Sequence, residues 1–289
     1  MNIVLKISCP DQKGIVASVA SRLSNLNCNI LESSQFFQPD RGTERKDGVG
    51  RFFMRIECSV AETALADLRS SLDDFGREFS ADVSTTSDSQ VVRTILMVSK
   101  FDHCLQDIFY RVRTGTLPVE IVAVVSNHMD SQADAERRGI PFHFLQVTKE
   151  NKTEQESKLD TLIKDTGAEL IVLARYMQIL SDSFSSKYRG NIINIHHSFL
   201  PAFKGAKPYH RAWDRGVKHI GATAHYVTPD LDEGPIIEQD TERVSHACGP
   251  DELVRRGRDI EARVLSRALK LHAEQRVFIN ENRTVVFEE

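Results

Sequence analysis

Apolar strands separated by helical patterns constrain the fold of this chain more than any other feature. Residues 121–125 read Ile-Val-Ala-Val-Val, and similar apolar runs occupy 93–99, 170–174 and 192–195. A strand that is apolar on both faces is typical of a parallel sheet covered by helices on each side. The segments between these runs have helical patterns, as expected of the crossover connections that parallel strands need. We therefore predict a doubly wound α/β domain from residue 93 onward, with ligands at the carboxyl ends of its strands.

The first 84 residues predict a separate unit with another element order. Strand and helix patterns follow one another as βαββαβ, which is the ferredoxin-like arrangement. The expected elements are strands over 2–8, 29–37, 50–60 and 78–84 and helices over 16–23 and 61–75. A polar stretch without periodicity, Ser-Thr-Thr-Ser-Asp-Ser-Gln, follows and reads as a linker. The expected domains are therefore 1–84 and 93–289, joined by a linker over 85–92.

Composition limits the classes of partner and the compartment. The net charge is −4, which gives no electrostatic reason to expect nucleic acid or an anionic membrane as partner. The five cysteines are scattered and lack CxxC spacing, so neither a disulfide framework nor a zinc site is indicated. The sequence contains no apolar run of membrane-spanning length and opens directly in an alternating strand pattern. We expect a cytoplasmic protein with free thiols.

Two segments carry side chains suited to acyl chemistry. Ile193 and Ile195 alternate with Asn194 and His196, so a strand would present the amide and the imidazole on one face. Some thirty residues later, Asp232 lies in a loop bounded by prolines. An amide donor, a proton-handling imidazole and a carboxylate together supply what the attack of a nucleophile on a carbonyl requires.

The motifs that contain these residues resemble a known family. Asn-Ile-His, Ser-Phe-Leu-Pro and His-Tyr-Val-Thr-Pro-Asp-Leu-Asp-Glu-Gly-Pro closely resemble the folate-dependent formyltransferases, and the similarity runs from about Arg93 to the C-terminus. The resemblance implies that Asn194, His196 and Asp232 are catalytic and that His225 supports them. It further implies a folate-binding set composed of Leu180, Gln178, Thr228, Asp230 and Gly234. Gln178 departs from the pattern, because transformylases that act on a ribonucleotide often carry Arg there.

The N-terminal unit resembles an ACT domain. The element order and the Asp-Gln-Lys-Gly-Ile-Val turn after the first strand carry this likeness. ACT domains commonly pair through sheet edges or helices and often bind an amino acid near that turn. The resemblance thus implies a homo-oligomer and an amino-acid effector near Asp11, Gly14 and Ile15. A role in oligomerisation without amino-acid binding is an equally open interpretation of this unit.

The loop over 99–105 separates this chain from the family members that use a ribonucleotide. Those members carry a glycine-rich loop that cradles a phosphate, whereas this loop reads Ser-Lys-Phe-Asp-His-Cys-Leu. With an ACT-like domain, such a loop is typical of the branch in which water replaces the amine. The implied reaction is hydrolysis of 10-formyltetrahydrofolate to formate and tetrahydrofolate, which serves one-carbon metabolism and purine biosynthesis. A formyltransferase to a small non-phosphorylated amine and a folate-binding regulator are the alternatives.

We expect the folate to be the substrate and no cofactor or metal to be needed. The adjacent histidines could suggest a metal, but strand alternation would turn His197 to the face opposite His196, so the two could not easily share an ion. No role is assigned to His210, which lies at an expected helix start. Asp102 and His103 either close the vacated acceptor pocket or cap the next helix.

Overall fold

The computed structural model describes residues 1–39, 50–202 and 208–288 and divides into two compact units. Unit 1 comprises residues 1–90, 274–278 and 285–289, and unit 2 comprises residues 91–273 and 279–284. Among the helices within those described ranges, none is long and apolar enough to cross a membrane. Each unit is considered by itself.

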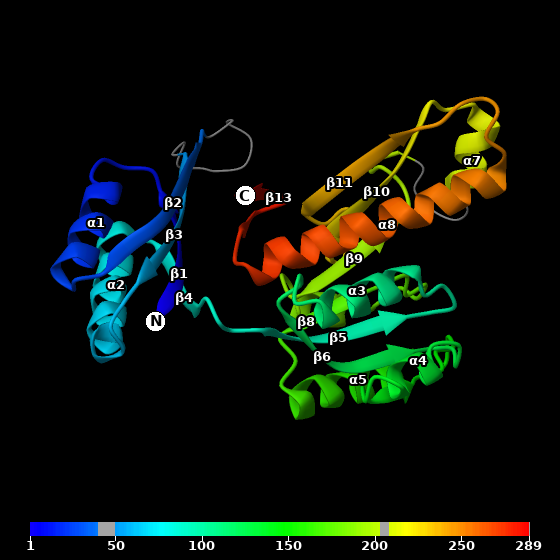
Figure 1. Ribbon diagram of the computed structural model, residues 1–289, viewed down its shortest axis with the longest axis horizontal. Coiled ribbons are helices and arrows are strands. Elements are labelled where there is room, and N and C mark those ends of the chain that lie inside the picture. The colour runs from blue at the N-terminus through cyan, green and yellow to red at the C-terminus, as the bar shows by residue number, and fades with distance from the viewer. Residues whose placement is uncertain (40–49, 203–207, 289) are drawn as a thin grey trace. The chain divides into compact units, whose positions relative to one another are not determined.

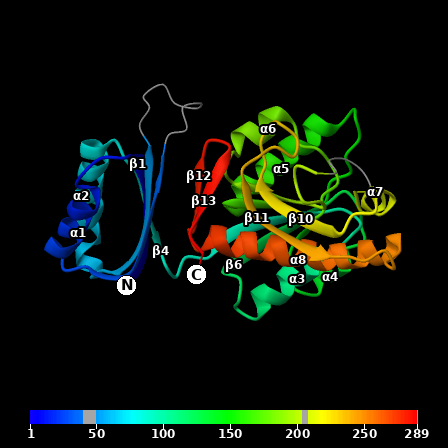
Figure 2. The same cartoon turned by 90° about the horizontal axis from the view of Figure 1, so that it is seen from above.

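Unit 1 is an antiparallel sheet with two helices on one face (Figure 2). The strand order is β2-β3-β1-β4, and every neighbouring pair is antiparallel, which confirms the predicted ferredoxin-like arrangement. The elements are β1 (Asn2–Pro10), α1 (Ile15–Asn25), β2 (Asn29–Gln38), β3 (Arg51–Ser59), a 3-10 turn (Glu62–Ala64), α2 (Leu65–Phe79) and β4 (Asp82–Ser87).

Helix α2 ends later than expected, which moves β4 along the chain. The sequence pattern predicted a helix to residue 75 and a strand from 78. Phe75 and Phe79 are one helical turn apart, stack at a centroid distance of 4.6 Å and are both buried, so the helix extends to cover the sheet. Ser80 then takes a left-handed conformation and ends the helix. Because β4 runs to Ser87, the predicted linker over 85–92 is partly strand, and 88–91 connects the units.

The C-terminal segment returns to unit 1, whereas the sequence interpretation gave all of 93–289 to the second domain. Strand alternation on β3 explains the return: Phe52 and Met54 face the helices, while Phe53 and Arg55 face the other way. Phe278 packs edge-on against Phe53 at 5.6 Å, and the Lys6 ammonium donates to the Val277 carbonyl at 2.6 Å. The segment thereby covers the second face of the sheet.

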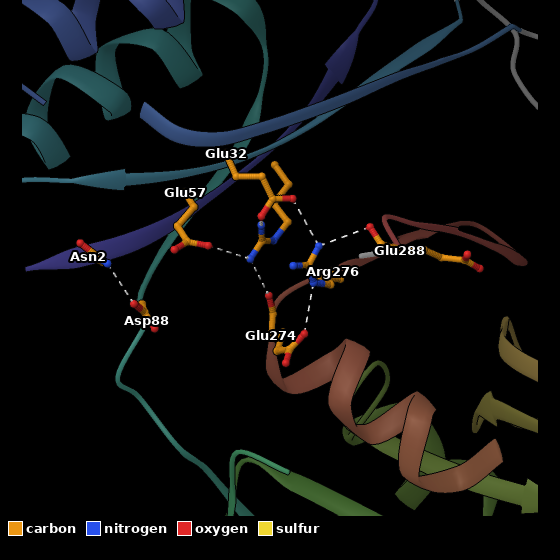
Figure 3. A network of polar contacts seen from close by, with 8 residues as sticks. Asn2, Glu32, Glu57, Asp88, Glu274, Arg276 and Glu288 are labelled. Carbon is orange, nitrogen blue, oxygen red and sulfur yellow. Dashed lines mark hydrogen bonds and ion pairs between the residues drawn. The ribbon is translucent and has the colours of Figure 1, made fainter. Parts of the chain in front are cut away.

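Buried charges fix this segment (Figure 3). Arg55 is only 2% exposed and pairs with Glu32 at 3.0 Å while donating to the Glu274 carbonyl at 3.3 Å. Arg276 lies 3.4 Å from Glu32 and 3.1 Å from Glu274. A buried guanidinium is tolerated only when paired, so the tail supplies acceptors that the sheet alone lacks.

Unit 2 is a seven-stranded sheet with helices on both faces, which confirms the predicted doubly wound fold. The order is β11-β10-β9-β8-β5-β6-β7, with a parallel block from β9 to β7 and antiparallel β10 and β11 at one side. Helices α3 and α8 lie on one face and α5 on the other (Figure 1). The order reverses between β5 and β8, where an open α/β sheet leaves a crevice for ligands.

The elements of unit 2 follow the sequence expectations with few exceptions. They are β5 (Val92–Val98), α3 (His103–Arg113), β6 (Val119–Ser126), α4 (Gln132–Glu136), β7 (Phe142–Phe144), α5 (Lys152–Thr166), β8 (Leu170–Leu173), α6 (Asp182–Lys187), β9 (Ile192–His196), α7 (Pro208–Arg215), β10 (His219–Tyr226), β11 (Ile236–Arg243) and α8 (Pro250–Ala273). The tail forms β12 (Val277–Asn280) and β13 (Arg283–Val286). Helix α6 was not expected, because its six residues are too few to show a helical period.

Candidate active site

A cavity of about 290 Å³ lies where the parallel strands β8 and β9 end. Three segments line it: 173–180 after β8, 194–197 at the end of β9, and 225–232 from β10 into the following loop. In a doubly wound fold, ligands bind at the carboxyl ends of the parallel strands, which is where this cavity lies. The cavity therefore brings together the two motifs that the sequence places thirty residues apart.

Strand pairing sets His225 opposite Asn194. β10 runs antiparallel to β9, and the register places these two residues directly across from each other. His225 Nδ1 lies 2.9 Å from the carbonyl oxygen of Tyr226, and Asn194 Nδ2 lies 3.2 Å from His225 Nε2. Since a carbonyl only accepts, Nδ1 carries the proton and Nε2 accepts from the amide. Burial lowers the pKa of His225, in keeping with a neutral ring.

Asp232 and His196 form an ion pair at the floor of the cavity. Asp232 Oδ1 lies 3.1 Å from His196 Nδ1 and 3.9 Å from His225 Nε2. Although partial burial raises the pKa of Asp232, its hydrogen bond and its electrostatic interaction with His196 outweigh burial and hold the pKa below its ordinary value. Asp232 is thus ionised near neutral pH, and it occupies Nδ1 of His196.

The other nitrogen of His196 has no partner in the parts of the chain that the structure describes. Nε2 is buried without a hydrogen bond, and the ring lines the cavity. A buried polar atom without a partner is costly, so it points to a group that a ligand supplies. Asp232 itself has φ +57°, a conformation uncommon outside glycine that clusters at functional sites.

His197 does not turn away from the site, and the expectation of opposite faces for the two histidines is wrong. β9 ends at His196, so strand alternation stops there. The two rings lie 5.2 Å apart, and both line the cavity. Burial and the nearby Arg175 guanidinium lower the pKa of His197 to about 3, so this ring is neutral at physiological pH.

The expected folate-binding residues do not all line the cavity. Gln178, Leu180, Thr228 and Asp230 do, whereas Gly234 lies outside it. A Cβ added at Gly234 would meet the carbonyl oxygen of Tyr226 at 1.8 Å, so this glycine lets the loop close against β10. Sequence reasoning missed the exposed apolar side chains that flank the cavity, namely Met177, Ile179 and Leu231. Their surface suits a flat, partly apolar ligand.

The remaining candidates lie elsewhere. His210 is exposed on α7 and does not line the cavity. His103 donates to or accepts from Glu261 at 2.8 Å, while Asp102 accepts from Gln106 at 3.2 Å. In the N-terminal turn, Gly14 has φ +95° and the side chain of Ile15 is buried, so an effector there would meet backbone groups. Asp11 is exposed beside them.

One cluster in the described ranges has the composition of a metal site. His103, Cys104 and Glu261 offer ligand atoms within 4.8 Å of one another. Burial raises the pKa of the Cys104 thiol well above its ordinary value, which disfavours the thiolate that a metal needs. Glu261 already accepts from Tyr209 at 2.7 Å, so a hydrogen-bonded network accounts for the cluster.

Comparison with known proteins gives consistent matches. Residues 92–269 match the family described as "Formyl transferase". The formyltetrahydrofolate deformylase of Corynebacterium sp. (strain P-1) is 47% identical over 285 residues, covering 98% of this chain and 97% of that protein. The crystal structure of a formyltetrahydrofolate deformylase from Pseudomonas putida KT2440 has a TM-score of 0.91 at 44% identity, covering 99% and 100%.

A transferase is similar over a smaller part. The phosphoribosylglycinamide formyltransferase from Coxiella burnetii has a TM-score of 0.63 at 31% identity, covering 68% of this chain and 94% of that one. The likeness to the deformylases therefore spans both units, whereas the likeness to this transferase leaves about a third of the chain uncovered.

Gly234→Ala should loosen the loop over 228–234. The new methyl would overlap a backbone oxygen that no side-chain movement can clear, so we expect a loss of about 1–3 kcal/mol and faster hydrogen exchange in the loop. Gly249→Ala is the matched control, because an added Cβ there meets nothing within 4 Å. Equal melting temperatures and loop exchange rates for the two variants would contradict this account.

His197 should make unit 2 less stable in mild acid. Its pKa is lower in the folded than in the unfolded state, so its contribution to stability is present above about pH 6.5 and lost as the pH falls toward 3. Between pH 6.5 and 5.0 we expect wild type to lose up to about 2 kcal/mol more than His197→Gln. Urea unfolding followed by Trp213 fluorescence measures this, and parallel pH profiles for the two proteins would refute it.

Proposed function

This chain belongs to the formyltetrahydrofolate deformylase family, and we infer that it hydrolyses 10-formyltetrahydrofolate to formate and tetrahydrofolate. The observation that carries the proposal is the Asp232–His196 pair, which lines the cavity with Asn194 and whose Nε2 has no partner among the described residues. These groups match the needs of a formamide whose carbonyl must accept negative charge when water adds. The reaction consumes only water and the folate, so the proposal includes no cofactor and no metal.

Asn194 can donate a hydrogen bond to the oxyanion while His225 holds its amide in place. Its amide nitrogen carries two hydrogens, and one is directed at His225 Nε2. The second is available to the oxygen of the formyl group, and a single donor of this kind is worth roughly 3–4 kcal/mol in the transition state. His225 thus acts as a positioning residue, since its neutral ring accepts from Asn194 and leaves the amide oriented.

His196 and Asp232 handle the protons. Water adds to the formyl carbon as its proton passes to the Asp232–His196 pair, and the carbonyl becomes an oxyanion. When the tetrahedral species collapses, the bond from carbon to N10 breaks and N10 takes a proton from His196 Nε2. Collapse yields formic acid, whose remaining proton passes to solvent, so formate leaves as an anion with release of one proton and tetrahydrofolate leaves as the neutral amine. Asp232 holds the His196 ring through Nδ1 during both proton transfers.

The composition of the loop over 99–105 supports water as the nucleophile. The loop over 99–105 contains no glycine, and Phe101 packs over the Arg175 guanidinium at 5.8 Å. Backbone N–H groups therefore cannot approach a phosphate as a ribonucleotide acceptor requires. We propose hydrolysis in place of transfer on this ground.

Asp232→Asn should abolish formate release from 10-formyltetrahydrofolate while leaving tetrahydrofolate binding nearly intact. The amide keeps the shape of the loop but neither takes a proton nor stabilises a charged His196, so turnover should fall by several orders of magnitude. Wild type is assayed without any amine, with Asp214→Asn on α7 as the control variant. Formyl transfer to an added amine in place of formate release would replace the hydrolase with the transferase alternative.

We also propose that unit 1 holds subunits together and binds a small amino acid near Asp11, Gly14 and Ile15, in a cytoplasmic homo-oligomer. β2 is an edge strand of its sheet and exposes Leu31, Phe36 and other apolar side chains. An exposed apolar edge is a template for pairing with a second copy.

Phe36→Lys should lower the oligomeric state measured by light scattering. Removal of unit 1 is a poor test, because residues 274–278 and 285–289 pack within it and would lose their partners. Ala66→Lys is the control, since Ala66 is exposed on α2 and belongs neither to β2 nor to the turn near Gly14. An unchanged mass for Phe36→Lys would count against pairing through β2.

A further inference from the structure

Arg175 is a buried cation at the edge of the candidate active site. Arg175 follows the end of β8 by two residues, and the last residue of that strand, Leu173, pairs with Asn194. The Arg175 side chain is 10% exposed and lines the same cavity. Its backbone has φ +65°, an uncommon conformation for a residue with a side chain. Such strain persists only where the surrounding structure fixes it.

Contacts from several elements hold this arginine in place. Ser99 N donates to the Arg175 carbonyl at 3.3 Å, and Ser99 Oγ accepts from Met177 N at 3.0 Å. The carboxylate of Glu261 on α8, which is only 1% exposed, lies 3.2 Å from Arg175 Nε. Phe101 covers the guanidinium plane. The cation is therefore preorganised before any ligand arrives.

Arg175 retains unused donors despite these contacts. Neither Nε nor Nη1 makes a hydrogen bond to the residues that the structure describes, because the approach of Glu261 is close but poorly aligned. Glu261 instead accepts from Tyr209 at 2.7 Å and bonds His103 at 2.8 Å. Two buried guanidinium nitrogens without a hydrogen-bond acceptor, in a side chain that lines the cavity, indicate an anionic ligand.

The proposed reaction forms formate, an anion, in a cavity that already contains the ionised Asp232. Water and a neutral formamide enter, and formate is formed next to the ionised Asp232. The rings of His197 and His225 are neutral near pH 7, as their lowered pKa values indicate. Of the described residues that line the cavity, Arg175 is the sole lysine or arginine. A small anion in this partly buried space needs a cation, and Arg175 supplies it.

We propose that Arg175 is the binding group for the carboxylate of formate, and that Glu261 is the residue that positions it. The proposal rests on the function inferred above and specifies how its product is held. Formate accepts from the Arg175 guanidinium within the cavity, while the tetrahydrofolate occupies the region toward Gln178 and Leu180. The network of Glu261, His103 and Tyr209 keeps the guanidinium oriented.

Formate binding to the full-length protein in the presence of tetrahydrofolate tests this directly. The line width of ¹³C-formate gives its affinity without turnover, and product inhibition gives it under turnover. Arg175→Gln should weaken formate by roughly 10- to 100-fold, the range expected when a charged hydrogen-bonding partner is removed. The affinity for tetrahydrofolate should change less than twofold. Arg258→Gln is the matched control, since Arg258 also covers the Phe101 ring, at 4.9 Å, but does not line the cavity.

A second variant controls for misfolding caused by leaving Glu261 unpaired. Arg175→Gln leaves Glu261 buried without its cation, so Arg175→Gln/Glu261→Gln removes both charges together. The double variant should bind formate as weakly as the single one. Unchanged formate affinity in a folded variant would overturn the proposal, and so would an equal loss of formate and tetrahydrofolate, which would mean that Arg175 only shapes the cavity. Failure of the inferred function is distinguishable, because wild type would then release no formate at all.

Discussion

The ion pair between Asp232 and His196 is the interaction on which the site depends. It joins the end of β9 to the loop after β10, and thus ties together two segments that the sheet alone would only bring close. By occupying Nδ1, the carboxylate directs the other ring nitrogen at the cavity. It also stabilises positive charge on the imidazole when a proton arrives. The left-handed conformation of Asp232 and the close approach of Gly234 to Tyr226 both shape the loop that holds the Asp232 carboxylate next to His196.

Most of the fold could be predicted from local patterns, because each apolar strand and each amphipathic helix carries its own period. The candidate site could be predicted as well: Asn194 and His196 share one face of a short strand, Asp232 lies in a loop marked by prolines, and all three line one cavity. The pairing of His225 with Asn194 needed the antiparallel register between β9 and β10, which the sequence does not specify. The prediction that His196 and His197 face opposite sides was wrong, because the strand ends at His196 and its side-chain alternation does not continue to His197.

Long-range charge pairs were not predictable from the sequence. Arg175 lies in the segment after β8 and Glu261 lies on α8, and each looks like an ordinary surface charge in the sequence. A weak signal existed for Glu261, because it lies on the same face of α8 as Val264, Leu265 and Ala268, which are all buried. The return of the C-terminal segment to unit 1 was missed for the same reason. Arg55 lies on β3, and only the fold reveals that it donates to the Glu274 carbonyl in addition to pairing with Glu32.

Isotopic labelling tests the central claim most directly. If water is the nucleophile that the Asp232–His196 pair activates, turnover of 10-formyltetrahydrofolate in H₂¹⁸O without any amine should place one ¹⁸O atom in each formate molecule. The second oxygen should remain that of the original formyl group. Mass spectrometry of the released formate reads this out after a single turnover. Formate without the label, or the absence of formate until an amine is added, would contradict hydrolysis at this site.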